Sequence, residues 1–385
     1  IRIAYGSAAS EAAAARAQGK PWTTRINVAM PVVKKVEIDD SLGDVPLVTE
    51  YSYREGTWDP RDRTFAGFGG GVERQVGDET APTLLSESTF DVGVAHPVLR
   101  GMPLTSEARD DKGYVFSRTT SKYVVVNLFS SSDGRTIEYG YKISELTDSL
   151  EGTDASKIRS TLTEWEQDKF GNVVAEHRWG EVVGDDKLAG HDEAITRSSF
   201  ANNEDDWILG RIATSELTDA AGKRVSMSRT YYDGTPFEGL ALGKVARGDV
   251  SRIEHWKGPG PDDFVLSVAS SYNSDGLVTE TRDARGGGRI YEWNSQDHTT
   301  LLSETAKLDG RSMQERTSVD PGTGKVLSVT GYDGQTTRWV YDALGRPVEV
   351  YQPGDGPALG HRLPAGHDPR HGARRQTPLR PPRRH

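Results

Sequence analysis

The stretch from Gly331 to Gly356 constrains the fold most strongly, because it holds two aromatic–aspartate pairs that each meet a glycine. The pairs are Tyr332-Asp333 and Tyr341-Asp342, and the second leads through Gly345 into a β-branched run. Aspartate opens a turn by accepting hydrogen bonds from nearby backbone, and glycine adopts the positive φ that a tight hairpin requires. The stretch therefore predicts a strand–turn–strand unit.

Weaker copies of this unit lie upstream. Another pattern that recurs with these copies is a glycine followed closely by valine, as in Gly276 and Val278 or Gly324 and Val326. A unit of about 20 to 25 residues cannot bury an apolar face alone, so neighbouring copies must stack. Aromatic or β-branched residues precede Asn or Asp at spacings of 21, 26 and 22 residues: Tyr272-Asn273, Trp293-Asn294, Val319-Asp320 and Tyr341-Asp342.

The composition agrees with short strands and many turns, since the 385 residues include 42 glycines and 19 prolines. We predict an all-β chain with an irregular β-rich region over residues 1–150. Stacked antiparallel strands over 151–357 are expected to form a curved sheet. Residues 358–385 are expected to form a disordered basic tail. One short helix is predicted at Ser10–Lys20, with Ser10 as its N-cap and Gly19 as its stop.

Local patterns give further expectations. The run Gly67–Gly71 fits a hairpin turn flanked by Phe65 and Phe68 better than a phosphate-binding loop, because Val72 occupies the position of the last required glycine. Other segments are predicted as an irregular strand pair over 22–37, a strand within 98–107, a polar linker over 145–156, and a hairpin joining 157–166 to 172–183.

Charge and cysteine content exclude several classes of site. The net charge is −10, and the final 25 residues hold seven arginines and one acid, so the rest of the chain is more acidic still. Such a body repels nucleic-acid phosphates, and we predict no nucleic-acid partner. The absence of cysteine excludes disulfides, thiolate metal sites and a thiol nucleophile. No apolar run approaches the length of a membrane span, so we predict no membrane insertion.

The basic tail differs from everything before it. Residues 361–385 contain five prolines and four of the nine histidines without strand periodicity. This composition is typical of a disordered end, and it also matches a GC-rich coding sequence read out of frame. The chain begins with a strand-like Ile1–Tyr5 and no initiator methionine, which favours a fragment of a longer polypeptide.

No catalytic, cofactor-binding or metal-binding residues are predicted, and no cofactor. The chain has no G-x-S-x-G and no H-E-x-x-H, and the acid-rich segments 202–206 and 185–186 lack the spacing of a calcium loop. A hydrolase that uses unmarked carboxylates stays as a third alternative. The isolated histidines without patterned partners are His96, His177, His191, His255 and His298.

The tryptophans allow a second function. They could line a sugar-binding face of a secreted module, although their wide scatter, usually in mid-strand positions, fits structural anchors better. Under the sugar-binding alternative, Trp293 and Trp339 are the residues to replace. The eight are Trp22, Trp58, Trp165, Trp179, Trp207, Trp256, Trp293 and Trp339.

A family resemblance follows from the motifs in order. Tyr341–Arg346 and Asp283–Gly286 resemble YD repeats of the RHS family. The N-terminal series resembles the middle region of the B component of bacterial insecticidal toxin complexes and of plasmid-virulence B-type proteins, although Thr64 and Ala66 stand where the family phrase carries charged residues. That series runs through residues 19–25, 32–36, 51–56, 63–69 and 99–107.

The resemblance covers about residues 1–357 and implies a non-catalytic function. In that family the B component and a C-type RHS component close a hollow shell around a toxic polypeptide, and the shell docks on a pore-forming A component. The chain is thus expected to be a secreted bacterial shell segment with these partners. The family's propeller, self-cleaving core and toxic domain are not visible in the sequence.

Overall fold

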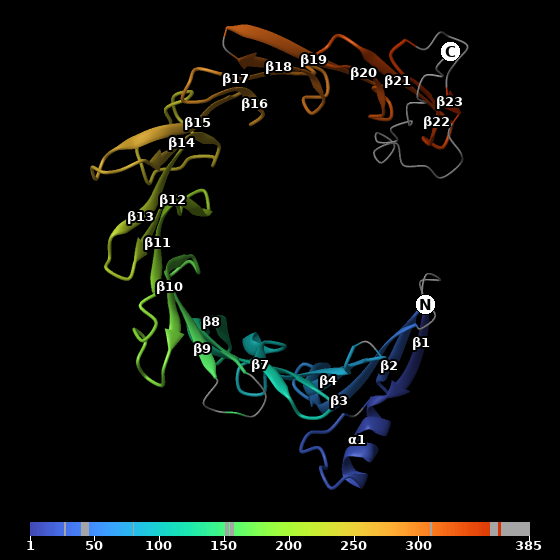
Figure 1. Ribbon diagram of the computed structural model, residues 1–385. Helices are drawn as coiled ribbons and strands as arrows, with labels where there is room; N and C mark the ends of the chain where they lie inside the picture. The colour runs from blue at the N-terminus through green and yellow to red at the C-terminus, as the bar shows by residue number, and fades with distance from the viewer. Residues whose placement is uncertain are drawn as a thin grey trace, which may run out of the picture. The chain divides into compact units, whose positions relative to one another are not determined.

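The computed structural model describes residues 1–26, 28–39, 46–79, 81–150, 154, 158–308, 310–354 and 361–362 (Figure 1). All strands in these ranges belong to one antiparallel sheet. The same ranges contain one α-helix and one short 3₁₀ helix. The prediction of an all-β chain is confirmed. The predicted tail over 358–385 lies outside the described residues except for 361–362.

The chain divides into two compact units. Unit 1 comprises Ile1–Ser198 and Ser215–Val225, and unit 2 comprises Ser199–Thr214 and Ser226–His385. The predicted domain boundaries at 150 and 357 stay predictions.

Unit 1 contains the helix and the first ten strands. Its elements are β1 (Arg2–Ser7), α1 (Ala8–Ala17), β2 (Pro31–Ile38), β3 (Leu47–Asp59), β4 (Thr64–Val76), β5 (Leu84–Phe90), the 3₁₀ helix η1 (Pro97–Leu99), β6 (Pro103–Asp110), β7 (Val115–Ser130), β8 (Thr136–Ser149), β9 (Arg159–Gln167) and β10 (Val173–Val182). Strands β11 (Ala194–Asn203), β12 (Ile208–Asp219) and β13 (Arg224–Tyr232) contribute residues to both units.

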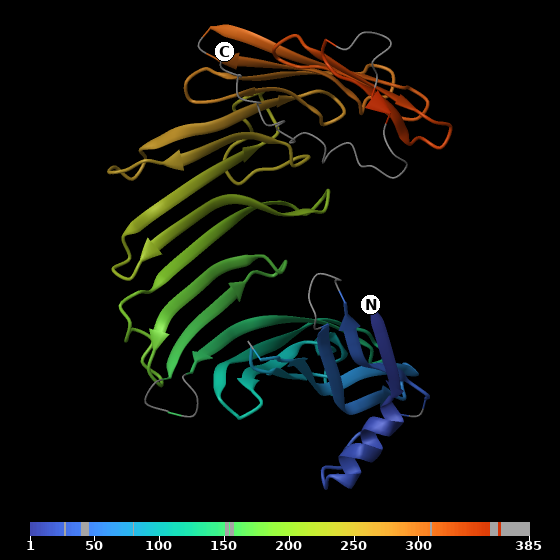
Figure 2. The same ribbon diagram turned by 45° about the vertical axis from the view of Figure 1, so that its right-hand side comes forward.

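Unit 2 continues with shorter strands that lie side by side in Figure 2. They are β13 (Arg224–Tyr232), β14 (Val250–Trp256), β15 (Phe264–Tyr272), β16 (Val278–Arg282), β17 (Gly288–Trp293), β18 (Leu301–Leu308), β19 (Arg311–Val319), β20 (Val326–Thr330), β21 (Thr336–Tyr341), β22 (Pro347–Tyr351) and β23 (His361–Arg362).

Each strand pairs antiparallel with the next strand along the chain, from β1 to β11 in one series and from β13 to β23 in another. The predicted hairpin of β9 and β10 is present, with Trp165 opposite Glu176. Local pairing of this kind needs only a tight turn between strands.

Eight of the turns share one geometry. The backbone N–H of the first turn residue donates to the carbonyl of the residue that follows the four-residue turn. The fourth residue is a glycine with positive φ, and its N–H donates to the carbonyl of the first residue. This is a type I turn followed by a left-handed residue, a common hairpin connection. The eight turns span residues 110–113, 131–134, 168–171, 219–222, 273–276, 283–286, 331–334 and 342–345.

The turn mechanism predicted from the sequence is confirmed at the repeat marks. Asn273 Oδ1 accepts the backbone N–H groups of Asp275 and Leu277, and Asp342 Oδ1 accepts those of Leu344 and Arg346. Each side chain thus closes the turn that its strand enters.

Helix α1 begins earlier than predicted. Ser7, not Ser10, is the N-cap, and Ser10 is the third helical residue. The Ser10 N–H donates to Ser7 Oγ at 3.1 Å, while the Ser7 N–H donates to Ser10 Oγ at 3.2 Å, so the two serines form a capping box. Gly19 follows the helix with a φ of 74°, as the predicted stop requires.

Three other local predictions were wrong. The run Gly67–Gly71 lies inside β4, and the turn before it ends at Arg63. Residues 22–37 contain one strand, β2, instead of a pair. The predicted linker over 145–156 starts as strand, because β8 continues to Ser149, and most of its remainder lies outside the described residues. By contrast, the strand predicted within 98–107 is confirmed, since β6 begins at Pro103 after η1.

The sheet buries little of its surface. No large side chain in the described ranges is fully buried. A small core in unit 2 joins Ala201, Ala213, Tyr232 and Val245. Because side chains on a single sheet stay half-exposed unless other chain segments cover them, the few segments that add such cover contribute disproportionately to burial.

Candidate functional site

Aromatic residues at strand ends form a recurring backbone anchor in unit 2. Tyr272 Oη donates to the carbonyl of Val250 at 2.8 Å, and Tyr341 Oη donates to that of Val326 at 2.8 Å. Trp293 Nε1 donates to the Val278 carbonyl at 2.7 Å. In each case the aromatic residue ends its strand and the valine begins the preceding strand. The aromatic residue that precedes Asn or Asp and the valine that follows glycine, two patterns seen separately in the sequence, are therefore joined by one hydrogen bond.

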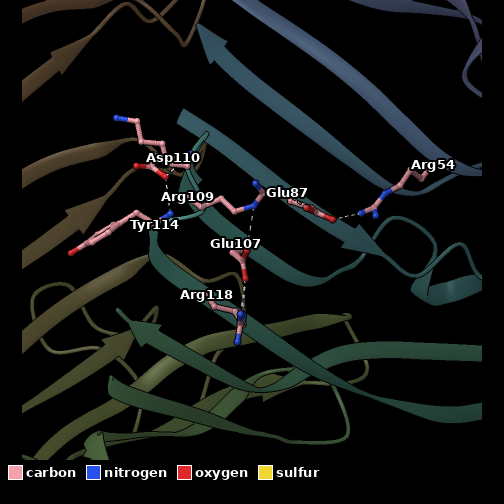
Figure 3. A network of polar contacts seen from close by, with 8 residues as sticks. Arg54, Glu87, Glu107, Arg109, Asp110, Tyr114 and Arg118 are labelled. Atoms are coloured by element: carbon pink, nitrogen blue, oxygen red, sulfur yellow. Dashed lines mark hydrogen bonds and ion pairs between the residues drawn. The ribbon is translucent and has the colours of Figure 1, made fainter. Parts of the chain in front are cut away.

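A second feature is a ladder of alternating charges across unit 1 (Figure 3). The Glu87 carboxylate on β5 forms ion pairs with two guanidinium groups, that of Arg54 on β3 at 2.5 Å and that of Arg109 on β6 at 3.1 Å. Glu107 on β6 contacts Arg109 at 3.5 Å and Arg118 of β7 at 2.7 Å. Glu87 and Glu107 face each other directly in the pairing of β5 and β6, so Arg109 bridges two like charges.

The pKa of Glu87 reflects this position. Partial burial acts to raise the pKa of the Glu87 carboxyl, but the hydrogen bond from Arg109 and the charge of Arg54 outweigh it and hold the pKa below its ordinary value. The Glu87 carboxylate is therefore ionised at neutral pH.

The glycine run of β4 makes the ladder possible. Strand β4 lies between β3 and β5, and Arg54 is paired with Gly70. A Cβ on Gly70 would lie 3.3 Å from Arg54 Nη2 and 3.1 Å from the Ser88 carbonyl oxygen. Because Gly70 has no side chain, Arg54 passes over β4 to reach Glu87. Sequence reasoning missed this role, since the spacing of glycines alone does not show a neighbour two strands away.

Residues 19–26, here called the strap, cover part of β3. The Glu55 carboxylate accepts the backbone N–H groups of Thr23 and Thr24 at 2.9 and 3.1 Å and both threonine hydroxyls. Burial acts to raise the Glu55 pKa, and these hydrogen bonds lower it below its ordinary value. The Trp22 ring meets Phe68 edge-on at 6.2 Å. The strap thus gives unit 1 a second layer.

The groove between α1, the strap and β3 encloses about 500 Å³ and includes Glu11, Arg54 and Glu55 among its lining residues. Each of these three charged groups is already engaged, Glu11 by Lys34 at 2.7 Å, Arg54 by Glu87 and Glu55 by the strap. The three charged groups of this groove are therefore held in structural contacts.

Unit 2 obtains its second layer from the long loop 233–249 between β13 and β14. The Asp233 carboxylate accepts the backbone N–H groups of Ala246, Arg247, Gly248 and Asp249 at 2.6 to 3.0 Å. Burial acts to raise the Asp233 pKa, and these four donors outweigh it and lower the pKa. The clasped loop places Val245 in the small core with Tyr232.

The sequence candidates for chemistry lie apart. His96 contacts Glu138 at 3.1 Å, His177 contacts Glu166 at 3.1 Å, and His298 contacts Asp275 at 2.8 Å, each as a separate pair. Asp185 and Asp186 lie in the turn after β10, and residues 202–206 form the end of β11 and its turn. Within the described ranges, no group of three His, Cys, Asp or Glu side chains could hold a metal ion.

Three tryptophans are fixed through their indole N–H groups, Trp179 to Glu164, Trp256 to the Gly260 carbonyl and Trp293 to the Val278 carbonyl. These contacts agree with the structural-anchor interpretation. Trp207 does not lie within a strand, contrary to the mid-strand expectation, and its side chain projects from a turn with 76% of its surface exposed.

Comparison with known families explains the N-terminal architecture. Residues 1–98 match the family described as the insecticide toxin TcdB middle/N-terminal region, and residues 321–356 match the RHS repeat. The chain carries a TcdB middle/N-terminal region and an RHS repeat. The TcdB-type region contains α1, the strap and the glycine run of β4, whereas the RHS repeat contains β20, β21 and β22.

Solved structures confirm the fold. A TcdB2-TccC3-Cdc42 crystal structure matches with a TM-score of 0.71 and 14% identity over 98% of this chain and 25% of that chain. A TcdB2-TccC3 crystal structure matches with a TM-score of 0.70 and 13% identity over 98% and 26%. A Photorhabdus luminescens Tc holotoxin pore matches with a TM-score of 0.71 and 14% identity over 90% and 23%. A comparison with curated protein sequences finds no match.

The chain therefore shares its fold with part of these TcdB2-TccC3 structures, and it spans about a quarter of the length of these solved chains. The family resemblance drawn from the sequence motifs is confirmed. No helix in the described ranges is long and apolar enough to cross a membrane.

Proposed function

We propose that this chain is a non-catalytic wall segment of a bacterial toxin-complex shell that encloses a toxic polypeptide. One observation carries the proposal: a TcdB-type region continues into consecutive hairpins held by backbone anchors and charge ladders. These contacts join neighbouring strands to one another and stabilise the sheet. A C-type RHS component would complete the shell, and a pore-forming A component would receive it.

The partners follow from the relatives. The similar solved structures contain TcdB2 together with TccC3, and one is a Tc holotoxin pore. We extend this assembly to the present chain as part of the proposal, with secretion from a bacterium. The fixed indole groups of Trp179, Trp256 and Trp293 support structural use of tryptophan over a sugar-binding face.

The test uses co-expression of the full chain with the C-type component from the same bacterium and its C-terminal passenger. We expect a stable complex in which the passenger resists a protease that digests it in the absence of the chain. A passenger that is digested equally fast with and without the chain would contradict the proposal.

A second measurement needs the chain alone. The full chain should show a β-rich circular dichroism spectrum and bind a hydrophobic dye, because half-exposed apolar side chains lack their neighbours in the shell. A compact monomer that binds no dye would argue for an independent module instead.

A further inference from the structure

The turn between β11 and β12 carries a tryptophan where the eight hairpin turns described above carry glycine. Residues 204–207 form this turn, and the Trp207 N–H donates to the Glu204 carbonyl at 3.4 Å, as the turn glycine does in the eight hairpins described above. Trp207 has a φ of 56°, in the left-handed region. Its side chain is 76% exposed.

This placement costs free energy twice. A bulky L-residue is strained at positive φ, and an exposed indole orders water around a large apolar surface. Phe237 also has positive φ, at 67°, but its ring is covered by the Arg282 guanidinium 3.5 Å from the ring centroid. Trp207 has no comparable ring or cation contact within the described part of the chain. Intramolecular packing therefore gives no reason for a tryptophan at this position.

The turn is nevertheless held firmly. Asn203 Oδ1 accepts the Asp206 N–H at 3.1 Å, and Asn203 Nδ2 donates to Asp206 Oδ2 at 2.8 Å. The same amide donates to the Val245 carbonyl of the clasped loop at 3.4 Å. Trp207 thus lies on a turn that is already ordered, and this reduces the entropic cost of binding a partner there.

The residues around Trp207 select the kind of partner. Glu204, Asp205 and Asp206 are all exposed beside it, so the tip combines one large aromatic side chain with three carboxylates. Anionic membranes and nucleic acids are repelled by such a tip. An apolar pocket with an arginine or lysine rim is complementary to it in both shape and charge.

We propose that Trp207 is a docking anchor that inserts into a basic-rimmed apolar pocket of the C-type component. This inference rests on the proposed function and names one contact within that assembly. The carboxylates of the tip would accelerate association, and the indole would supply most of the binding free energy.

The experiment measures binding of the full chain to the C-type component in the wild type and in Trp207→Gly. We expect affinity to fall at least about tenfold in Trp207→Gly and much less in Trp207→Phe. Leu344→Ala is the matched control, because Leu344 is 77% exposed in another hairpin turn and should leave the affinity unchanged. The double variant Glu204→Gln, Asp205→Asn should bind more slowly at low salt, and its association rate should depend less on salt.

Thermal unfolding gives an independent result. Trp207→Gly should melt at the same or a higher temperature, since glycine relieves the strained φ. A lower melting temperature would show an internal structural role and overturn the inference. If the wild type binds the C-type component and Trp207→Gly binds it with the same affinity, the inference is overturned and the proposed function stands. Failure of the wild type to bind overturns both, and Trp207-dependent binding on a glycan array would replace the protein partner with a sugar.

Discussion

At the scale of single residues, stability depends on carboxylates that satisfy several backbone donors at once. Asp233 holds four N–H groups of its loop, and Glu55 holds two N–H groups and two hydroxyls of the strap. A backbone donor left unsatisfied in a covered position costs more than the bond contributes. Such residues fasten a second layer onto a single sheet.

Replacement of Asp233 tests this role. Asp233→Ala leaves four N–H groups without an acceptor, so we expect the free energy of unfolding to fall by about 2 kcal/mol, measured by urea denaturation. The matched control is Asp262→Ala, because Asp262 is 82% exposed on the side chain and makes one ion pair with Arg229. Equal free energies of unfolding for the two variants would contradict this role of the Asp233 carboxylate.

Gly70 makes a second residue-scale prediction. Gly70→Ala places a Cβ 3.1 Å from the Ser88 carbonyl oxygen and against Arg54, so the contact with Glu87 should be displaced at a cost of roughly 1 kcal/mol. Gly322→Ala is the control, because the added Cβ would lie no closer than 3.5 Å to its nearest neighbour, Asp320 Oδ1, an ordinary van der Waals contact. In a double-mutant cycle, Gly70→Ala and Arg54→Ala should couple, and strict additivity would show that Gly70 does not clear the path of Arg54.

At the scale of elements, the hairpin turn is the unit that the sequence predicts best. Its determinants lie within five residues, an acceptor at the first position and a glycine at the fourth, so no knowledge of distant neighbours is needed. The glycine run of β4 shows the opposite case. Gly70 leaves room for Arg54 of β3 to reach Glu87 of β5, but in the sequence a run of glycines resembles a turn.

The turn glycines can be tested where no neighbour complicates the result. Gly222 has a φ of 74°, and a Cβ added there would meet open space, so Gly222→Ala adds backbone strain alone. We expect a loss of about 1 kcal/mol in the free energy of unfolding, and a smaller loss for Gly222→Asn because asparagine tolerates this conformation. If alanine and asparagine behave alike, backbone strain is not the cause.

At the scale of the whole molecule, fold class, antiparallel pairing and family were predictable because a local unit recurs along the chain. The segments that add a second layer were not. The strap and the loop 233–249 are positioned by Glu55 and Asp233 through contacts that depend on the folded sheet. The exposed Trp207 was counted among structural anchors, since sequence position does not show whether a tryptophan points inward.

The abundance of hydrogen-bonded turn carboxylates predicts sensitivity to acid. Backbone hydrogen bonds to Asp297 from Thr299 and Thr300 lower its pKa from 3.8 to about 2, and the hydrogen bond from Arg135 lowers that of Asp133 to about 2. A carboxyl with a lowered pKa stabilises the folded state above the unfolded pKa near 4, and this contribution is lost as the pH falls toward about 2.

The melting temperature should therefore be steady from neutral pH to about pH 5 and fall steeply between about pH 4 and pH 2. The decrease should be shallower in Asp297→Asn, which removes one titrating group. A melting temperature that rises on acidification would contradict this assignment.

The pairing of each strand with its immediate neighbour in sequence has an evolutionary consequence. Two strands and their turn can be duplicated or deleted as one genetic segment, because the partners of the remaining strands do not change. The length of the sheet can then change one hairpin at a time. Insertions that fall within a strand shift its register, so tolerated length changes should cluster at the glycine turns.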